Sequence, residues 1–176
     1  MVTRRDFLGA LAFAAGSRRR ELRAAMELVM GPLPRAKKAP LDVSVIETVD
    51  LAGFVRKKIT YTAEKDDRVP AFLLIPKNLR GRVPAMLCLH QTVRIGKAEP
   101  AGLGGNPNLH YARELAERGY ITLAPDYPNF GDYAIDVYQR GYSSATRKAI
   151  FNHMRAVDLL RSLPEVARDR IGSIGH

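Results

Sequence analysis

Short apolar runs and segments of helical periodicity alternate through the second half of the chain. Because strands that alternate with helices pair in parallel, this order predicts an α/β fold with helices on both faces of a sheet, a three-layer αβα arrangement. The first run is continuously apolar, as expected for a strand that is covered on both faces. The order is an apolar run at 84–90, a helix at 108–118, a run at 120–124, a helix at 144–163 and a run that begins at Ile171.

The first half of the chain carries a different pattern, in which apolar and polar residues alternate one by one. This period of two is typical of strands with one face in the core. We expect antiparallel strands at one side of the sheet, preceded by a short helix over Glu21–Met30 that ends at Gly31-Pro32. The expected strands are Val43–Val49, Phe54–Thr62 and Val69–Ile75.

The helix at 144–163 is expected to pack through one apolar stripe. Four apolar residues recur along it at helical spacing, and Pro164 follows its end. They are Ile150, Met154, Val157 and Leu160.

The amino-terminal residues have the order of an export signal. Arg4 and Arg5 precede Phe7-Leu8 and a weakly apolar stretch that ends near Gly16. The stretch has roughly ten residues, about half of what a membrane-spanning helix needs, so we expect no permanent membrane span. The pattern resembles the twin-arginine signal of bacteria, which indicates a periplasmic or extracellular protein. The alternative is a basic amphipathic helix on a cytoplasmic protein.

Three local sequences, in this order, resemble the α/β-hydrolase fold and within it the dienelactone hydrolase and acetyl xylan esterase group. They are Pro84–His90 with Gln91-Thr92, Gly119–Pro128, and Asp169–His176. The last resembles the strand that enters the sharp Gly-His-Ser-x-Gly turn of these enzymes. The resemblance implies the amino-terminal part of a hydrolase sheet. We therefore expect a signal segment at 1–16, a helix and arm at 17–40, and a truncated α/β-hydrolase domain at 41–176.

The resemblance implies a nucleophilic serine directly after His176, a position that this sequence does not include. A serine on a tight strand-to-helix corner needs small residues two positions away, and Gly175 meets this requirement. His176 is then a neighbour of the serine, or simply a polar residue at a strand end, because the resemblance puts the general base far downstream. Ser173 is a rival nucleophile, but a corner at Ser173 leaves too few strand residues before it to cross the sheet.

Ester hydrolysis also needs donors for the oxyanion of the tetrahedral intermediate. The resemblance implies that one donor is a backbone N–H in the loop after His90, from Gln91 or Thr92. Many hydrolases have glycine beside this histidine, and Gln91 departs from that pattern, so both amides stay candidates. The alternative is that Gln91 and Thr92 only cap the strand end.

The other chemistry-bearing residues have structural explanations. We expect Cys88 to be a buried hydrophobe, and His110 and His153 to be packing or surface residues within helices, without metal partners. The segment Gly102–Gly105 lacks a nucleotide-binding fingerprint and is interpreted as a mobile loop near the mouth of the site. Asp126 either lines the pocket or binds the amides of its own turn. No cofactor or metal is implied.

These observations predict a serine hydrolase that acts on small carboxylic esters, of esterase, acetyl esterase or lactone hydrolase type, with this chain an incomplete and inactive portion of it. A peptidase of the same fold, and a non-catalytic binding module or inert fragment, are the alternatives. The formal charge of +10 raises the question of a nucleic-acid partner, but the basic residues are scattered, without interleaved aromatics or a binding module. The sequence leaves the oligomeric state open.

Overall fold

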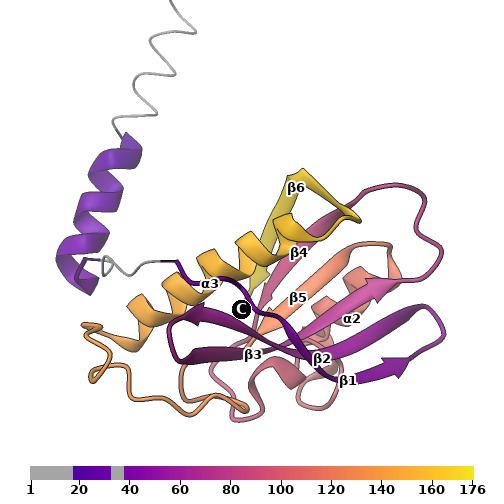
Figure 1. Ribbon diagram of the computed structural model, residues 1–176, viewed down its shortest axis with the longest axis horizontal. Helices are drawn as coiled ribbons and strands as arrows, with labels where there is room; N and C mark the ends of the chain where they lie inside the picture. The colour runs from indigo at the N-terminus through magenta and orange to yellow at the C-terminus, as the bar shows by residue number, and fades with distance from the viewer. Residues whose placement is uncertain (1–17, 33–37) are drawn as a thin grey trace, which may run out of the picture.

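The computed structural model describes residues 18–32 and 38–176, in which six strands form one sheet with helices on both faces (Figure 1). The helices are one over residues 18–30, α2 (Tyr111–Glu117) and α3 (Ala145–Ser162), with 3-10 turns at Gly96–Ala98 and Pro107–Leu109. The strands are β1 (Ser44–Asp50), β2 (Phe54–Glu64), β3 (Asp67–Pro76), β4 (Val83–Leu89), β5 (Ile121–Pro125) and β6 (Val166–Gly175).

The strands follow the order β1-β2-β3-β5-β4-β6 across the sheet. β2 pairs antiparallel with β1 and β3, and β3 also pairs antiparallel with β5. β4 pairs in parallel with β5 on one side and β6 on the other. The predicted change from antiparallel strands to parallel strands joined by helices is therefore confirmed.

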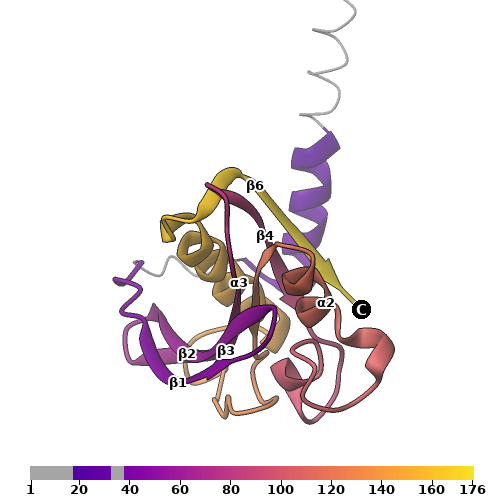
Figure 2. The same ribbon diagram turned by 90° about the vertical axis from the view of Figure 1, so that its right-hand side faces the viewer.

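Neighbouring residues of the central strands face opposite helices, as the two-residue period of a strand requires. Leu73 and Leu87 belong to the large apolar cluster that also contains residues of α3. Leu74 and Cys88, one position further along the same strands, pack on the side of α2. Figure 2 shows α2 and α3 on opposite sides of the sheet, so the expected three layers are present.

β6 lies at one edge of the sheet, beside β4 (Figure 2). Leu87 pairs with Ser173, and Leu89 pairs with Gly175. The expectation that the chain after Ile171 forms a strand is confirmed, and this strand pairs with β4. The strand begins already at Val166, and most of its residues beyond Val166 are exposed.

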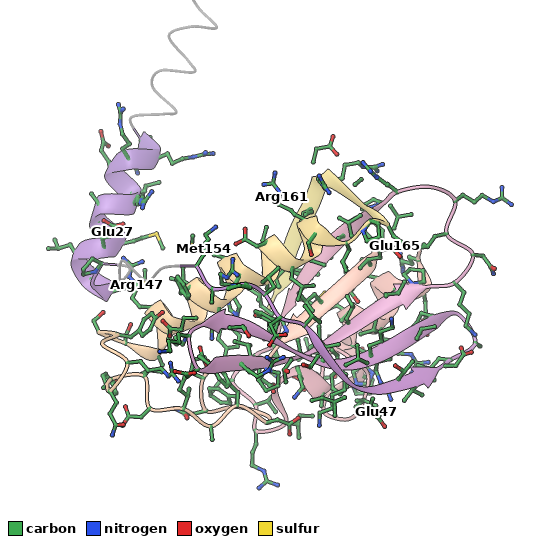
Figure 3. All side chains as sticks on the ribbon, in the orientation of Figure 1. Glu27, Glu47, Arg147, Met154, Arg161 and Glu165 are labelled. Carbon is green, nitrogen blue, oxygen red and sulfur yellow. The ribbon has the colours of Figure 1, made fainter. Side chains whose placement is uncertain are left out.

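The expected apolar stripe of α3 is right for Leu160 and Val157, which lie in or against the main core cluster, and wrong for Met154. Met154 is 45% exposed on the outer side of the helix (Figure 3), and Ile150 and Val157 are only partly buried, whereas Leu160 is buried. The buried side of α3 instead combines apolar and polar residues. They include Phe151, Ala156 and Leu159 together with Lys148, Asn152 and Arg155.

A buried polar network between α3 and the β2–β3 hairpin explains this difference. The ammonium group of Lys148 is fully buried, donates to Glu64 Oε1 at 2.6 Å and also pairs with Asp67. The hydroxyl of Tyr61 donates to the carbonyl oxygen of Asn152 at 3.0 Å. A hydropathy pattern treats lysine and asparagine as solvent-facing residues and so misses part of the side of the helix that faces the core.

The helix over residues 18–30 lies beside the amino-terminal end of α3 (Figure 1), and it extends the expected helix over Glu21–Met30 at its start. Ser143 Oγ donates to the carbonyl oxygen of Met30 at 2.6 Å, and Arg147 binds the carbonyl oxygen of Gly31. Within residues 18–32 and 38–176, no helix has the length and apolar character needed to cross a membrane. The expected signal segment at 1–16 lies outside the described residues.

Candidate active site

A pocket of about 320 Å³ opens where three neighbouring parallel strands end. His90 follows β4, Tyr127 follows β5 after one residue, and His176 follows β6. Crevices at the carboxyl ends of parallel strands are the usual ligand sites of open α/β sheets. The residues that line the pocket are His90, Gln91, Thr92, Tyr127, Pro128, Phe130, Ala145, Thr146 and His176.

Three of the four residues predicted for the site, Gln91, Thr92 and His176, therefore line one pocket, and Gly175 immediately precedes it. A Cβ atom added at Gly175 would lie 3.1 Å from Leu89 Cβ and 3.2 Å from the Leu89 carbonyl oxygen. These distances are shorter than an ordinary van der Waals contact, so a larger residue would push β6 away from β4. The catalytic roles of these four residues stay predictions.

The ring of His90 is buried under the pocket and is bound at both nitrogens. Its Nδ1 lies 2.6 Å from the carbonyl oxygen of Gln91, and its Nε2 accepts a hydrogen bond from the backbone N–H of Tyr127 at 3.0 Å. A carbonyl needs a donor and an N–H needs an acceptor, so this pattern fits a neutral ring with its proton on Nδ1. Burial lowers the pKa of His90, which agrees with the neutral form. His90 therefore joins the loops after β4 and β5.

The loop after β4 folds back directly beyond His90. The N–H of Val93 donates to the carbonyl oxygen of Gln91 at 2.8 Å, which makes a three-residue turn centred on Thr92. The Gln91 side chain donates to Glu99 Oε2 at 3.0 Å, and the buried Glu99 also accepts the N–H of Asn106 at 3.0 Å. The side-chain amide of Gln91 is thus bound within its own loop.

A buried ion pair connects this loop to the loop after β5. Lys97 is 2% exposed and Asp126 is fully buried, and Lys97 Nζ lies 2.5 Å from Asp126 Oδ2. The other carboxylate oxygen of Asp126 accepts the backbone N–H of Lys97 at 2.8 Å, and Oδ2 also accepts the N–H of Asp132 at 3.0 Å. Of the two alternatives for Asp126, binding to backbone amides is therefore correct, and Asp126 is not among the residues that line the pocket.

A second carboxylate extends this pair toward the surface. Asp132 Oδ2 lies 2.8 Å from Lys97 Nζ and 2.8 Å from Lys58 Nζ. Hydrogen bonds from Lys58 and then Lys97 lower the pKa of Asp132 to about 2. Lysines therefore neutralise both Asp126 and Asp132. Because Lys58 belongs to β2, these pairs also join β2 to the two loops that line the pocket.

Two glycines allow the loops to approach Asp126. Gly96 has a φ of +54° and Gly131 a φ of +57°, a region that side chains other than glycine rarely adopt. A Cβ atom at either position would overlap the carboxylate of Asp126. The ion pair and the two glycines thus fix the separation between the Gln91–Thr92 wall and the Tyr127–Phe130 wall.

The ring of His153, from α3, packs edge-on against the ring of Tyr127. The two ring centroids are 4.7 Å apart at an interplanar angle of 86°, and Tyr127 makes the same kind of edge contact with His90 at 4.7 Å. The Nε2 atom of His153 is buried, without a hydrogen-bond partner among the described residues. Burial, with a smaller contribution from His90, lowers the pKa of His153 to about 4.

The pKa of His153 has a consequence for stability at acid pH. Between pH 6.5 and pH 4 the unfolded chain binds a proton at this ring that the folded chain does not, so the free energy of unfolding falls as the pH falls. We expect His153 to contribute a loss of about 3 kcal/mol between pH 7 and pH 4, from 1.36 kcal/mol per unit. Urea unfolding of the native protein and of a His153→Phe variant at both pH values tests this, because phenylalanine keeps the ring contact and removes the titration. An equal pH dependence in the two proteins would contradict it.

The structure also places the remaining residues considered from the sequence. Cys88 is fully buried, and burial raises the pKa of its thiol to about 12, as expected for an inert hydrophobe. Ser173 lies within β6 opposite Leu87 and not at a corner. His110 precedes α2 instead of lying within it, and its Nε2 is bound to the carbonyl oxygen of Gly104 at 3.0 Å. Among the described residues, no group of three metal-binding side chains occurs.

The position of Gly102–Gly105 near the mouth of the site stays a prediction, and Gly105 lies against Glu99, whose other carboxylate oxygen binds the side chain of Gln91. None of these residues lines the pocket beside His90, and Gly102 borders a separate pocket together with Phe54 and Arg113. The loop between β4 and α2 crosses toward β2 after Glu99, and its residue Ala101 packs with Phe54 in one apolar cluster. Gly102 therefore lies toward β2, whereas Gly105 stays close to Glu99 in the loop after β4.

Sequence reasoning missed Lys97, Glu99 and Asp132. A single sequence does not distinguish a buried charged residue from an exposed one, and long charged side chains are exposed in most proteins. The one usable signal was their position, because loops that follow parallel strands often carry functional groups.

The comparisons with known proteins agree with the fold. A family profile described as the Abhydrolase family matches residues 3–156. YtaP of Bacillus subtilis, assigned as a hydrolase, is 26% identical over 174 aligned residues, which cover 89% of this chain and 56% of YtaP. The chain therefore spans little more than half the length of that relative.

Two solved structures of esterases have a similar fold. A protein from Bacteroides fragilis, assigned as an acetyl xylan esterase, superimposes with a TM-score of 0.70 at 24% identity, over 89% of this chain and 46% of that chain. The glucuronoyl esterase from Solibacter usitatus superimposes with a TM-score of 0.60 at 16% identity, over 84% of this chain and 48% of that chain. At these identities the similarity concerns the fold.

Proposed function

This chain belongs to the Abhydrolase family of the α/β-hydrolase superfamily, and from that membership we propose that it supplies the oxyanion side of the active site of a serine ester hydrolase. The nucleophile of this enzyme is a serine directly after His176, and the acid and general base come from later residues. The names of the similar structures, which include two kinds of esterase, support an ester as the substrate.

The observation that carries this proposal is the close approach of Gly175 to Leu89 beside the pocket. A nucleophile on a strand-to-helix corner has to project over the sheet while the backbone passes its neighbour closely, and only a small residue permits that passage. β6 leads to this point in parallel register with β4, and His176 already lines the pocket. The next side chain would therefore stand over the wall formed by Gln91 and Thr92.

In this proposal each wall of the pocket has a separate task. The backbone N–H of Gln91 or Thr92 donates to the oxyanion, together with the N–H after the serine, and acts where negative charge develops. Tyr127 and Phe130 form the opposite, mainly aromatic wall, against which the acyl or alcohol part of the substrate packs. A pocket of about 320 Å³ suits a small ester such as an acetyl ester or a lactone.

Removal of one amide donor tests the proposal. In the complete polypeptide that contains this chain, we expect hydrolysis of p-nitrophenyl acetate and a fall in kcat of about 10²–10³-fold in either Thr92→Pro or Gln91→Pro, since proline lacks the N–H. Neither position has a positive φ, so proline is not excluded by the backbone. The matched variant Thr92→Ala keeps the amide and is expected to retain activity. Initial rates and thermal melting of all four proteins give the result.

Three outcomes would contradict the proposal. One is esterase activity that neither proline variant lowers although both fold. Another is modification by a fluorophosphonate probe at a serine other than the one after His176. The third is cleavage of a peptide p-nitroanilide without cleavage of the ester, which would favour the peptidase alternative.

We also propose that residues 1–16 direct export through the twin-arginine route. The support is the sequence alone, in which Arg4 and Arg5 precede Phe7-Leu8 and a short apolar stretch. Fractionation of cells tests this by comparing the complete polypeptide with a double variant that carries both Arg4→Lys and Arg5→Lys. Unchanged export of that variant, or retention of the native protein in the cytoplasm, would contradict it.

A further inference from the structure

A second pocket, of about 260 Å³, lies at the opposite end of the sheet from the candidate active site. Its walls come from the turn between β1 and β2, from β2, from the middle of the loop between β4 and α2, and from α2 itself. Phe54 in this wall pairs with Pro76, beyond the point where Leu74 pairs with Thr122 near the start of β5. The candidate active site lies beyond the other end of β5, so the two pockets are separate.

Arg56 in this pocket is a half-buried cation without a partner. Its Nε atom is buried and forms no hydrogen bond, and its guanidinium makes no ion pair within the described parts of the chain. The guanidinium group lies over the ring of Phe72 in a cation–π contact, with Cζ 5.6 Å from the ring centroid. A buried N–H without an acceptor is uncommon in native proteins and calls for an explanation, such as a bound water or ion.

The neighbouring acids are already occupied. Asp126 pairs with Lys97, and Asp132 pairs with both Lys97 and Lys58. Glu117 accepts from Arg113 Nε at 2.9 Å. The pocket therefore contains two guanidinium groups and one carboxylate, and the excess positive charge resides on Arg56.

We propose that this pocket binds a small organic monocarboxylate, with the carboxylate on Arg56 and Arg113 and the carbon part against Leu51, Phe54 and Ala101. A planar carboxylate matches the fork of a guanidinium and forms strong charge-assisted hydrogen bonds with it. Arg113 uses its Nε for Glu117, and its terminal nitrogens form no hydrogen bond to described residues. Glu117 at the same wall disfavours a dianion such as phosphate through like-charge repulsion.

The backbone around the pocket fits such a ligand. Gly102 has a φ of +78°, and an added Cβ there would lie 2.7 Å from Arg113 Cδ, so the glycine lets the arginine lie flat against the loop. At Gly53 an added Cβ would meet no atom within 4 Å, which shows open space above the β1–β2 turn. The ligand therefore has access to Arg56 from that side.

Butyrate is the probe that tests this site. We titrate it into the ¹⁵N-labelled complete polypeptide and follow the amide signals of Gly53 and Gly102, with those of Thr92 as the reference for the active site. We expect shifts at the two glycines, and an affinity at least about tenfold lower in Arg56→Gln and in Arg113→Gln. Arg118→Gln is the matched control, because Arg118 pairs with Glu114 on the exposed surface of α2 and does not line the pocket.

Every other result overturns the proposal. No shift at Gly53 and Gly102 in the native protein removes the site, and shifts confined to Thr92 place the ligand in the candidate active site. An equal loss of affinity in Arg118→Gln shows non-specific attraction to positive charge. Binding of inorganic phosphate as tight as that of butyrate contradicts the assignment of a monocarboxylate. None of these readings depends on ester hydrolysis, so the failure of this site and that of the proposed function are separable.

Discussion

In the complete polypeptide of the proposed function, replacing Lys97 with methionine is expected to lower stability by about 3–5 kcal/mol and kcat/KM for p-nitrophenyl acetate by about 10²-fold or more. The substitution keeps most of the side-chain volume and removes the ammonium group. Asp126, which is fully buried, then retains its two backbone N–H donors and loses its only counter-ion within 4 Å among the described residues. An uncompensated buried carboxylate is the largest single cost that a substitution at this site introduces.

The expected loss of activity follows from position and not from contact with substrate. Lys97 does not line the pocket, but its backbone and side chain both bind Asp126, and Asp126 precedes Tyr127. A shift of the loop after β4 by about 1 Å would misplace the amides of Gln91 and Thr92 relative to the oxyanion. Lys97 and Asp126 are therefore positioning residues of the proposed site.

Two further variants separate these effects. Lys77→Met breaks the pair of Lys77 with Asp50, in which Asp50 is largely exposed, and should cost about 1 kcal/mol or less. In the double variant Lys97→Met with Asp126→Asn neither member of the buried pair carries a charge, so part of the stability returns while the activity stays low. Urea unfolding and steady-state kinetics of the four proteins give both quantities. Equal stability losses for Lys97→Met and Lys77→Met would contradict the claim that the loss of a buried partner costs more than the loss of an exposed one.

The sequence predicted the elements of this fold because they depend on periodicity. The continuous apolar run at 84–90 and the alternating residues of Phe54–Thr62 indicate how each strand is covered, and the stretch after Ile171 indicates a further strand. The order of pairing does not follow from the order in the chain, because β5 lies between β3 and β4. The structure confirms the strands and their directions. The sheet end at which Gln91, Thr92 and His176 meet follows from the same pattern, because parallel strands end on the same side.

Periodicity failed where buried groups are polar. The inner side of α3 carries Lys148 and Asn152, which a hydropathy pattern assigns to solvent, and the same pattern predicts a core position for Met154, which is exposed. For the same reason, hydropathy does not reveal the ion pair between Lys97 and Asp126, which are 29 positions apart in the sequence. Burial of such groups is decided by a specific partner at long range, and nothing in either local sequence encodes that partner.

Residues 18–176 produced alone are expected to self-associate and to show no hydrolysis of p-nitrophenyl acetate. β6 is an edge strand of ten residues with β4 as its neighbour on one side. Its carboxyl-terminal half pairs with β4 without interruption from Ile171 to Gly175, and Ile174 is 39% exposed. A long, regular edge with apolar side chains is a template for pairing with another chain.

Both edge strands carry an irregularity, but that of β6 lies before Ile171 and leaves Ile171–Gly175 regular, whereas that of β1 lies within the strand. β1 carries a register shift between Val45 and Glu47, and such irregularities twist an edge away from further pairing. Self-association should therefore proceed through β6. Sedimentation of residues 18–176 over a range of concentrations is expected to show oligomers, whereas the complete polypeptide is expected to show fewer or none.

A charge on the edge of β6 provides the decisive comparison. Ile174→Lys places an ammonium group next to the unpaired ladder of β6, and a partner strand would have to bury it, so the monomer fraction should rise. Tyr138→Lys is the matched control, because Tyr138 is 70% exposed in the loop before α3 and lies outside β6. Equal effects of the two lysines would mean that added net charge, and not the edge of β6, governs solubility. A monomer of residues 18–176 at every concentration would show that β6 is adequately protected by the exposed charges of its own first half.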